Sequence, residues 1–278
     1  MTETKRAVGV DWASGYWLAV EYEDDQYVDV LVEDDFEDIW ESYGSTVDRI
    51  LVDVPIGLFD EDDATSDERG RECDSLARKV LGSRWSSVFT PPARQAAELA
   101  EDESHKKISE KNREIVGKGL SIQAYHIASG IVEIDSFLNP DDEAEKQRRR
   151  DEAEKQRRRE VVKEAHPEVC FAAFDGDALE YSKTSAVGFG ERLSALENVV
   201  DEPGEVFREI GRDLAEFDGD ADVAAIDPDD VLDAMAMAVA AGADEDERWS
   251  LPEDPAVDER CLPMQMVYRA ETPFKFDE

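Results

Sequence analysis

The sequence predicts an α/β fold in which helices flank a mixed β-sheet. Short apolar runs near the N-terminus have the length of β-strands, and two of them end in an aspartate. Longer apolar and amphipathic segments, typical of helices, follow in the rest of the chain. The length of 278 residues suits a substantial core, so we expect a single domain over residues 1–278.

The first strands are predicted to form an antiparallel hairpin. Residues 7–10 are an apolar run that brings Asp11 to a strand end, and small residues at 13–15 open the backbone there. Residues 16–22 provide the returning strand, and residues 26–32 alternate as a third strand. A carboxylate in such a buried position must be paired, hydrogen-bonded or bound to a cation, so Asp11 requires a partner.

Residues 49–58 repeat this pattern after a predicted acidic helix over residues 35–43. An apolar strand ends in Asp53, and Pro55 and Gly57 then turn the chain. Two strands with the same ending, one of them within an antiparallel hairpin, favour a mixed sheet whose acidic ends lie side by side.

The remaining elements follow from apolar spacing. We predict helices over 66–81, 120 to about 137, from near 191, over 206–217 and over 229–241, a polar helical stretch over 95–118, a loop over 82–94, a strand-like stretch over 161–171, a closing edge strand over 263–268 and a polar tail over 270–278.

A charged segment over residues 139–160 interrupts this pattern. Residues 142–150 are repeated letter for letter at 151–159, and each copy holds three acids and four bases. The segment has almost no apolar residues, so we expect an exposed helix or a flexible insertion. A basic arm beside a nucleic acid is the alternative interpretation.

The composition is strongly acidic. Asp and Glu number 70 against 31 Lys and Arg, which gives a formal net charge of -39. Such a charge is tolerated best where molar salt screens it, so the sequence indicates a halophilic cytoplasm. The three cysteines form neither a disulfide framework nor a zinc motif, and we expect a cytoplasmic protein with no membrane partner.

Four aspartates are candidate metal ligands. Asp11 and Asp53 end strands, and Asp230 and Asp233 lie one turn apart on the most apolar predicted helix. Oxygen ligands from different elements suit Mg²⁺ or Mn²⁺, and two such ions can activate water and stabilise a leaving oxygen. The alternative is that these acids form turns and helix caps, which does not explain Asp233.

Motifs over most of the chain resemble domain-of-unknown-function family 429, described as predicted nucleases of RNase H-like fold. The motifs are Gly9-Val10-Asp11, Asp53-Val54-Pro55-Ile56-Gly57-Leu58, Cys73-Asp74 with Ala77-Arg78, Ser87-Val88-Phe89 with Pro92 and Arg94, Leu120-Ser121 with Gln123, His166-Pro167-Glu168-Val169 with Phe171, Gly188 with Arg192, and Asp230-Val231-Leu232-Asp233-Ala234. Trp12 replaces an expected small residue, and the duplicated segment lies outside the resemblance.

The resemblance implies an RNase H-like sheet with acids on the first strand, at the end of a later strand and on the last helix. It makes Asp11, Asp53, Asp230 and Asp233 metal-binding and catalytic candidates. It adds His166 and Glu168 as further catalytic candidates, although His166 can equally satisfy a buried carbonyl. The substrate-binding candidates are Ser87, Arg94, Ser121, Gln123 and Lys183, with helix capping preferred for Ser121.

Three functions remain open from the sequence. The first is a nuclease that uses Mg²⁺ or Mn²⁺ to cleave nucleic acid by a two-metal mechanism. The second is a nucleotide-binding protein related to actin-like domains, in which Asp11 and the Gly15 turn hold a nucleotide through Mg²⁺. The third is a binding protein that retains the acidic cleft without turnover.

Overall fold

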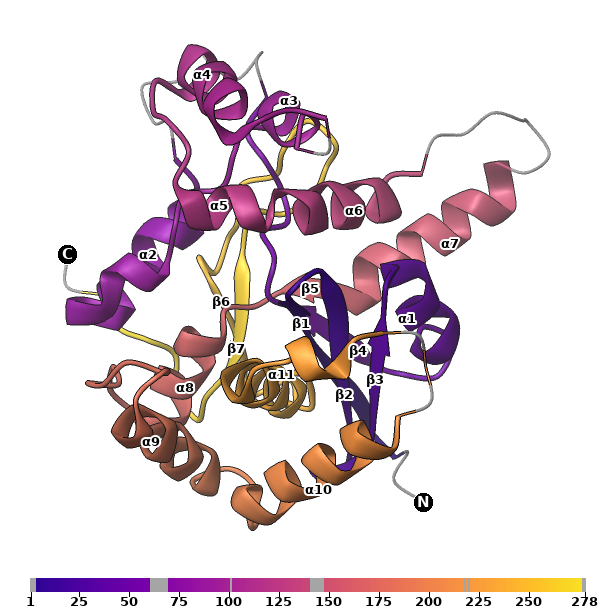
Figure 1. Ribbon diagram of the computed structural model, residues 1–278, viewed down its shortest axis with the longest axis vertical. Helices are drawn as coiled ribbons and strands as arrows, with labels where there is room; N and C mark the ends of the chain where they lie inside the picture. Colours follow the sequence, from indigo (N-terminus) through magenta and orange to yellow (C-terminus); the bar gives the residue numbers. More distant parts are fainter. Residues whose placement is uncertain are drawn as a thin grey trace.

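A five-stranded mixed sheet forms the centre of the molecule (Figure 1). Its strands are β1 (Arg6–Ala13), β2 (Tyr16–Glu23), β3 (Gln26–Glu33), β4 (Arg49–Val52) and β5 (Val162–Glu164), in the order β3-β2-β1-β4-β5. Strand β2 is antiparallel to both neighbours, whereas β1, β4 and β5 are parallel. The predicted mixed sheet with antiparallel first strands is confirmed.

The computed structural model describes residues 4–60, 70–100, 102–140, 148–217, 219 and 221–276, with the backbone alone for 148–151. The described residues contain eleven α-helices. They are α1 (Phe36–Tyr43), α2 (Glu72–Leu81), α3 (Arg94–Ala97), α4 (His105–Val116), α5 (Ile122–His126), α6 (Ala128–Leu138), α7 (Arg148–Val161), α8 (Pro167–Asp175), α9 (Ala186–Glu197), α10 (Pro203–Glu216) and α11 (Pro228–Ala241).

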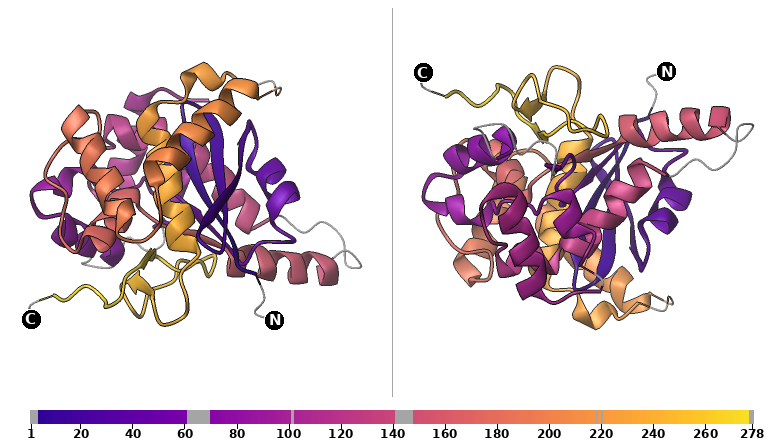
Figure 2. Two further views of the ribbon diagram at one scale, coloured as in Figure 1. Left: turned by 90° about the horizontal axis from the view of Figure 1, so that it is seen from below. Right: turned by 90° about the horizontal axis from the view of Figure 1, so that it is seen from above.

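Helices cover both faces of the sheet, as the two views of Figure 2 show. On one face, helices α1 and α6 pack against Val8 and Val10 of β1. On the other, α8 and α11 pack against a core that includes Ala7 and Ala13. This division follows from the two-residue period of a strand, which sends odd and even positions of β1 to opposite faces.

Two predicted elements differ from the observed ones because capping residues interrupt an apolar run. The predicted strand over 161–171 is wrong beyond β5, since α8 begins at Pro167. The His166 side chain caps this helix by accepting a hydrogen bond from the Glu168 amide at 3.2 Å. Glu168 therefore lies in the first turn of a helix. The predicted helix from 120 to about 137 is divided at Ile127 into α5 and α6.

The C-terminal part of the chain adds a small second sheet. Strand β6 (Arg248–Leu251) pairs antiparallel with β7 (Met266–Arg269), which corresponds to the predicted edge strand over 263–268. The tail that follows is less separate from the core than its polarity predicts, because Phe274 stacks on Tyr268 with ring centroids 4.6 Å apart.

The second copy of the duplicated segment lies in helix α7, whereas residues 141–147 are outside the described part of the chain. Helix α7 is not simply a solvent-exposed element. The Arg158 guanidinium lies 4.1 Å from the centre of the Phe137 ring, and Arg157 donates to the Gly44 carbonyl at 2.9 Å. The basic residues of this copy therefore dock the helix onto the domain through their guanidinium groups.

Candidate metal centre

Asp11 and Asp53 lie side by side on adjacent parallel strands. The pairing of Gly9 with Leu51 and of Val10 with Val52 leads directly to these two acids, and the Asp53 amide donates to the Val10 carbonyl at 3.0 Å. Asp11 shares the face of Gly9, which is directed at helix α11. The predicted proximity of the two acids is present, but the prediction that Asp11 ends its strand is wrong. Strand β1 continues to Ala13, so Asp11 lies within β1 beside the end of β4.

Gly9 allows helix α11 to approach the same face closely. A Cβ atom at position 9 would overlap the Ala234 carbonyl oxygen and the Ala238 amide nitrogen. Because glycine at 9 and alanines on the helix remove this bulk, α11 lies directly against β1. Asp233, one residue before Ala234, is consequently buried beside the strand-end acids, with an exposed fraction of 3%.

The three acids repel one another in a site with little water. Burial raises the pKa of Asp11 well above its ordinary value, and the charges of Asp53, Asp233 and Asp230 raise it further. Burial likewise raises the pKa of Asp53, and it raises that of Asp233 to about 7. Two neighbouring buried carboxylates of this kind resist simultaneous ionisation.

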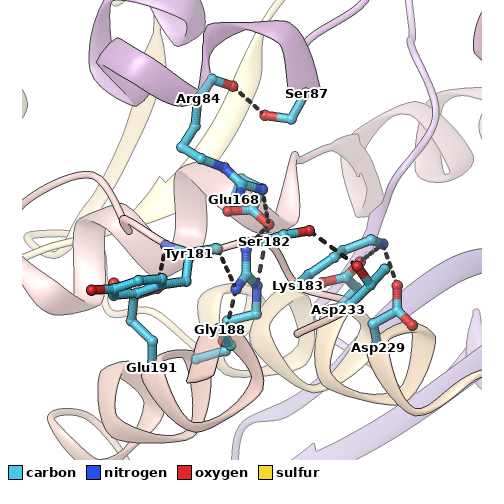
Figure 3. A network of polar contacts seen from close by, with 12 residues as sticks. Arg84, Ser87, Glu168, Tyr181, Ser182, Lys183, Gly188, Glu191, Asp229 and Asp233 are labelled. Carbon is cyan, nitrogen blue, oxygen red and sulfur yellow. Dashed lines mark hydrogen bonds and ion pairs between the residues drawn. The ribbon is translucent and has the colours of Figure 1, made fainter. Parts of the chain in front are cut away.

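Lys183 is the cation that the chain places in this cluster (Figure 3). Its Nζ lies 2.7 Å from Asp233 Oδ2 and 3.1 Å from Asp229 Oδ2, and it lowers the pKa of Asp11, Asp53 and Asp233. The other oxygen of Asp233, Oδ1, is buried and has no hydrogen-bond partner. An acceptor of this kind is costly unless a cation or water meets it.

Asp230 has a different role from Asp233. Its Oδ2 accepts a hydrogen bond from the Asp227 amide at 2.9 Å, and together the two residues form a capping box at the start of α11. The capping interpretation therefore holds for this residue. Its charge still acts on Asp11, but one of its oxygens is already used.

Glu168 lies next to the cluster and has its own countercharge. It is 5% exposed, pairs with the fully buried Arg192, and lies 3.8 Å from Arg84. Its charge raises the pKa of Asp53 and of Asp233. His166 also acts on Asp53, whose pKa it lowers, while its Nε2 lies 3.3 Å from the Ser87 carbonyl oxygen.

The substrate-binding candidates have varied surroundings. Arg94 is buried, and its guanidinium pairs with three acids that are outside the cluster, namely Asp60, Asp135 and Asp258. Ser121 caps helix α5 by accepting from the Ala124 amide at 3.0 Å, as expected for its alternative role. Gln123 is exposed on α5, and Ser87 donates its hydroxyl to the Arg84 carbonyl. Of this group, Lys183 directly contacts the aspartates.

Two residues important to the site were absent from the predicted set. Asp229 shares Lys183 with Asp233, and the spacing of four residues on one helix would have placed both on the same face. Arg192 neutralises Glu168 from helix α9, twenty-four residues away in the chain. No local pattern indicates that pairing, since only the tertiary fold joins the two helices.

A second group of ligand atoms is more compact. Atoms of Cys73, Asp74 and Glu164 lie within 4.8 Å of one another, and in the described part of the chain no three of the predicted aspartates are so close. However, Arg71 is paired with both Glu164 and Asp74 and donates to Cys73. A fully buried guanidinium thus already pairs with both carboxylates of this group, although Asp74 Oδ2, like Asp233 Oδ1, has no hydrogen-bond partner among the described residues. In the aspartate cluster the paired cation is Lys183, whose side chain is 36% exposed.

Fold and site together define an α/β protein in which Asp11 and Asp233 are buried, and Asp53 is half-buried, beside the end of strand β4. Residues 9–257 match a family described as "Protein of unknown function (DUF429)", and the chain belongs to that family. No curated protein and no solved structure matches the chain. Within the described ranges, no helix is both long enough and apolar enough to cross a bilayer.

Proposed function

We propose that this protein is a metal-dependent nuclease of RNase H-like fold, with Asp11, Asp53 and Asp233 as its metal ligands. One observation carries the proposal: acids from two parallel strands and from the last long helix converge in a buried site that holds too little positive charge. This placement of acids matches what the family resemblance implies for the first strand, a later strand and the last helix.

The residues fit a hard divalent cation. All three raised pKa values show that the folded chain favours neutralisation of these carboxylates. The unpartnered Oδ1 of Asp233 and the mutual repulsion of Asp11 and Asp53 identify carboxylates whose charge Mg²⁺ or Mn²⁺ would neutralise. When bound, such ions supply an activated water and stabilise the charge that develops on a phosphodiester.

The other residues of the chain would position the substrate and balance charge. Lys183, with its side chain 36% exposed, can turn from Asp233 towards a phosphate oxygen. Arg84 has donor groups free for the same purpose, because its contact with Glu168 is long, at 3.8 Å. Glu168 itself stays bound to Arg192, so we place it as a positioning residue and not as a metal ligand.

Cleavage of labelled DNA and RNA in molar KCl, with Mg²⁺ or Mn²⁺, tests the proposal. Asp11→Asn should lower the cleavage rate by roughly 100-fold to 1,000-fold, the range for loss of one electrostatic contact to a transition state. The control Asp34→Asn changes an exposed acid and should leave the rate unchanged.

Two other outcomes lead to different conclusions. Equal cleavage by wild type and Asp11→Asn would assign the activity to a contaminant and overturn the proposal. Thermal stabilisation by ATP with Mg²⁺, without any cleavage, would favour the nucleotide-binding alternative.

A further inference from the structure

Two large aromatic side chains are exposed on segments whose neighbouring residues contact Glu168 or Asp233. Trp85, in the 3₁₀ helix η2 (Gly82–Ser87), is 58% exposed, and Tyr181 is 45% exposed. Aromatic side chains of this size normally bury most of their surface, and those that stay exposed commonly serve as contacts for a ligand. Neither ring is part of the hydrophobic cores of the described residues.

Both aromatic residues belong to segments that are fixed at one carboxylate, Glu168. Arg84, next to Trp85, lies 3.8 Å from this carboxylate. Arg192 pairs with the same Glu168 oxygen and also donates to the Tyr181 carbonyl at 3.3 Å. Figure 3 shows Arg84 and Tyr181 on segments that meet near Glu168. The Tyr181 backbone is therefore anchored to the buried Glu168–Arg192 pair, whereas the Arg84 guanidinium only approaches that pair.

The same segments lead to the aspartate cluster. Lys183, two residues after Tyr181, contacts Asp233 at 2.7 Å. Ser87, two residues after Trp85, has its carbonyl oxygen 3.3 Å from Nε2 of His166, the residue that caps helix α8. Each exposed ring therefore lies two residues along the chain from a residue that contacts either Asp233 or His166.

The charge of the protein limits which nucleic acid it can hold. A net charge of -39 repels a phosphate backbone, and at high salt the counterion gain from phosphate contacts is small. A duplex has a higher charge density than a single strand and shields its base faces. Stacking of an unpaired base on an aromatic ring, in contrast, does not depend on phosphate charge.

We propose that the aspartate site takes single-stranded nucleic acid, with unpaired bases stacked on Trp85 and Tyr181. This inference rests on the proposed function, because it names the substrate class of the same site. Stacking on the two rings provides binding free energy that the acidic surface cannot provide through phosphate contacts. The aspartates receive the backbone phosphate that lies between the stacked bases.

Fluorescence anisotropy with labelled oligodeoxythymidylate and oligouridylate tests the inference in molar KCl. Ca²⁺ replaces Mg²⁺, so that binding is measured without dependence on cleavage. Trp85→Ala and Tyr181→Ala should each weaken binding by about 5-fold to 100-fold, which corresponds to the roughly 1–3 kcal/mol of one base stack. Trp85→Phe and Tyr181→Phe keep a ring and should retain most of the affinity.

The control variant is Val28→Ala, which removes an exposed apolar side chain from the distant edge strand β3 and should leave binding unchanged. A duplex containing the same labelled strand should bind more weakly than the single strand. Tighter binding of the duplex, no binding of either oligonucleotide, or wild-type affinity in both alanine variants would overturn the inference. Binding without cleavage in Mg²⁺ would refute the proposed nuclease alone, and cleavage with unchanged alanine variants would refute the stacking alone.

Discussion

Two clusters of buried acids in this molecule have opposite electrostatic states. Around Arg94, the carboxylates of Asp60, Asp135 and Asp258 surround one guanidinium, which pairs with all three. Around Asp11, the acids depend on Lys183, whose side chain is 36% exposed and contacts Asp233 and Asp229. The first cluster is saturated by the chain, and the second is not.

The difference separates a structural ion cluster from a candidate binding site. Asp258 is an example of a saturated acid. Besides its ion pair with Arg94, its carboxylate accepts hydrogen bonds from the amides of Leu58 and Leu262 at 3.1 and 2.8 Å. Asp233 shows the reverse, with one buried oxygen that has no partner. Acid abundance alone is uninformative in a chain of this composition, whereas an unsatisfied buried acid indicates a place for a cation.

The largest expected effect is loss of the cation from the saturated cluster. Arg94→Met keeps much of the side-chain volume but removes the countercharge that three buried acids share, although Asp135 keeps its ion pair with Arg260. The free energy of unfolding should therefore fall by about 3–5 kcal/mol. Urea unfolding in molar KCl, followed by tryptophan fluorescence, measures this change.

Asp11→Asn provides the opposite case in the same experiment. It removes one negative charge from the unsaturated cluster, so the metal-free protein should be as stable as wild type or more stable. If Asp11→Asn destabilised the protein as much as Arg94→Met does, the contrast between the two clusters would be wrong.

Sequence patterns predicted the aspartate cluster, but they did not predict the ion pairs that Arg94 makes with three acids. Asp11, Asp53 and Asp233 were identifiable because each lies at the end or on the face of an apolar element, where a carboxylate needs a reason to be present. The family resemblance made Arg94 a candidate for substrate binding. Its acidic partners lie 34, 41 and 164 residues away, and no local pattern can indicate such pairing.

The fold, like the two clusters, was predicted from the sequence only in part. The N-terminal hairpin and helix α11 followed from apolar periodicity, because each is a long element with one clear period. The boundary between β5 and α8 could not be predicted in this way, because both elements are apolar. The spacing of their apolar residues changes from that of a strand to that of a helix only at the cap formed by His166. The close contact of α11 with β1 depends on the absence of a side chain at Gly9, which becomes significant only when the helix is known to cross there.

An intermediate effect is expected from pH. Because burial raises the pKa of Asp233 from 3.8 to about 7, the folded chain holds a proton that the unfolded chain releases between these values. The stability of the metal-free protein should therefore fall as pH rises through this window, by roughly 1.4 kcal/mol per pH unit and about 2–3 kcal/mol between about pH 5 and about pH 7.

The same pH series with Mg²⁺ present gives a second test of the protonation of Asp233. Ionised ligands bind the metal, so thermal stabilisation by Mg²⁺ should grow as pH rises through the same window. Thermal unfolding at several pH values, with and without Mg²⁺, gives both slopes, and Asp233→Asn should reduce both. A stability that rises with pH in the metal-free wild type would contradict the assigned protonation of the cluster.

The smallest expected effect concerns the cation of the unsaturated cluster. Lys183 holds Asp233 and Asp229 together and so competes with a metal for the same carboxylate. Lys183→Met should tighten Mn²⁺ binding by about twofold to fivefold, in line with the ~1 kcal/mol upper range for a partly exposed ion pair. Titration calorimetry measures the change, and Lys183→Arg, which keeps the charge, is the control. Weaker Mn²⁺ binding by Lys183→Met would mean that Lys183 supports the ligands instead of competing with the metal, and the aspartates would then need their lysine as the other cluster needs Arg94.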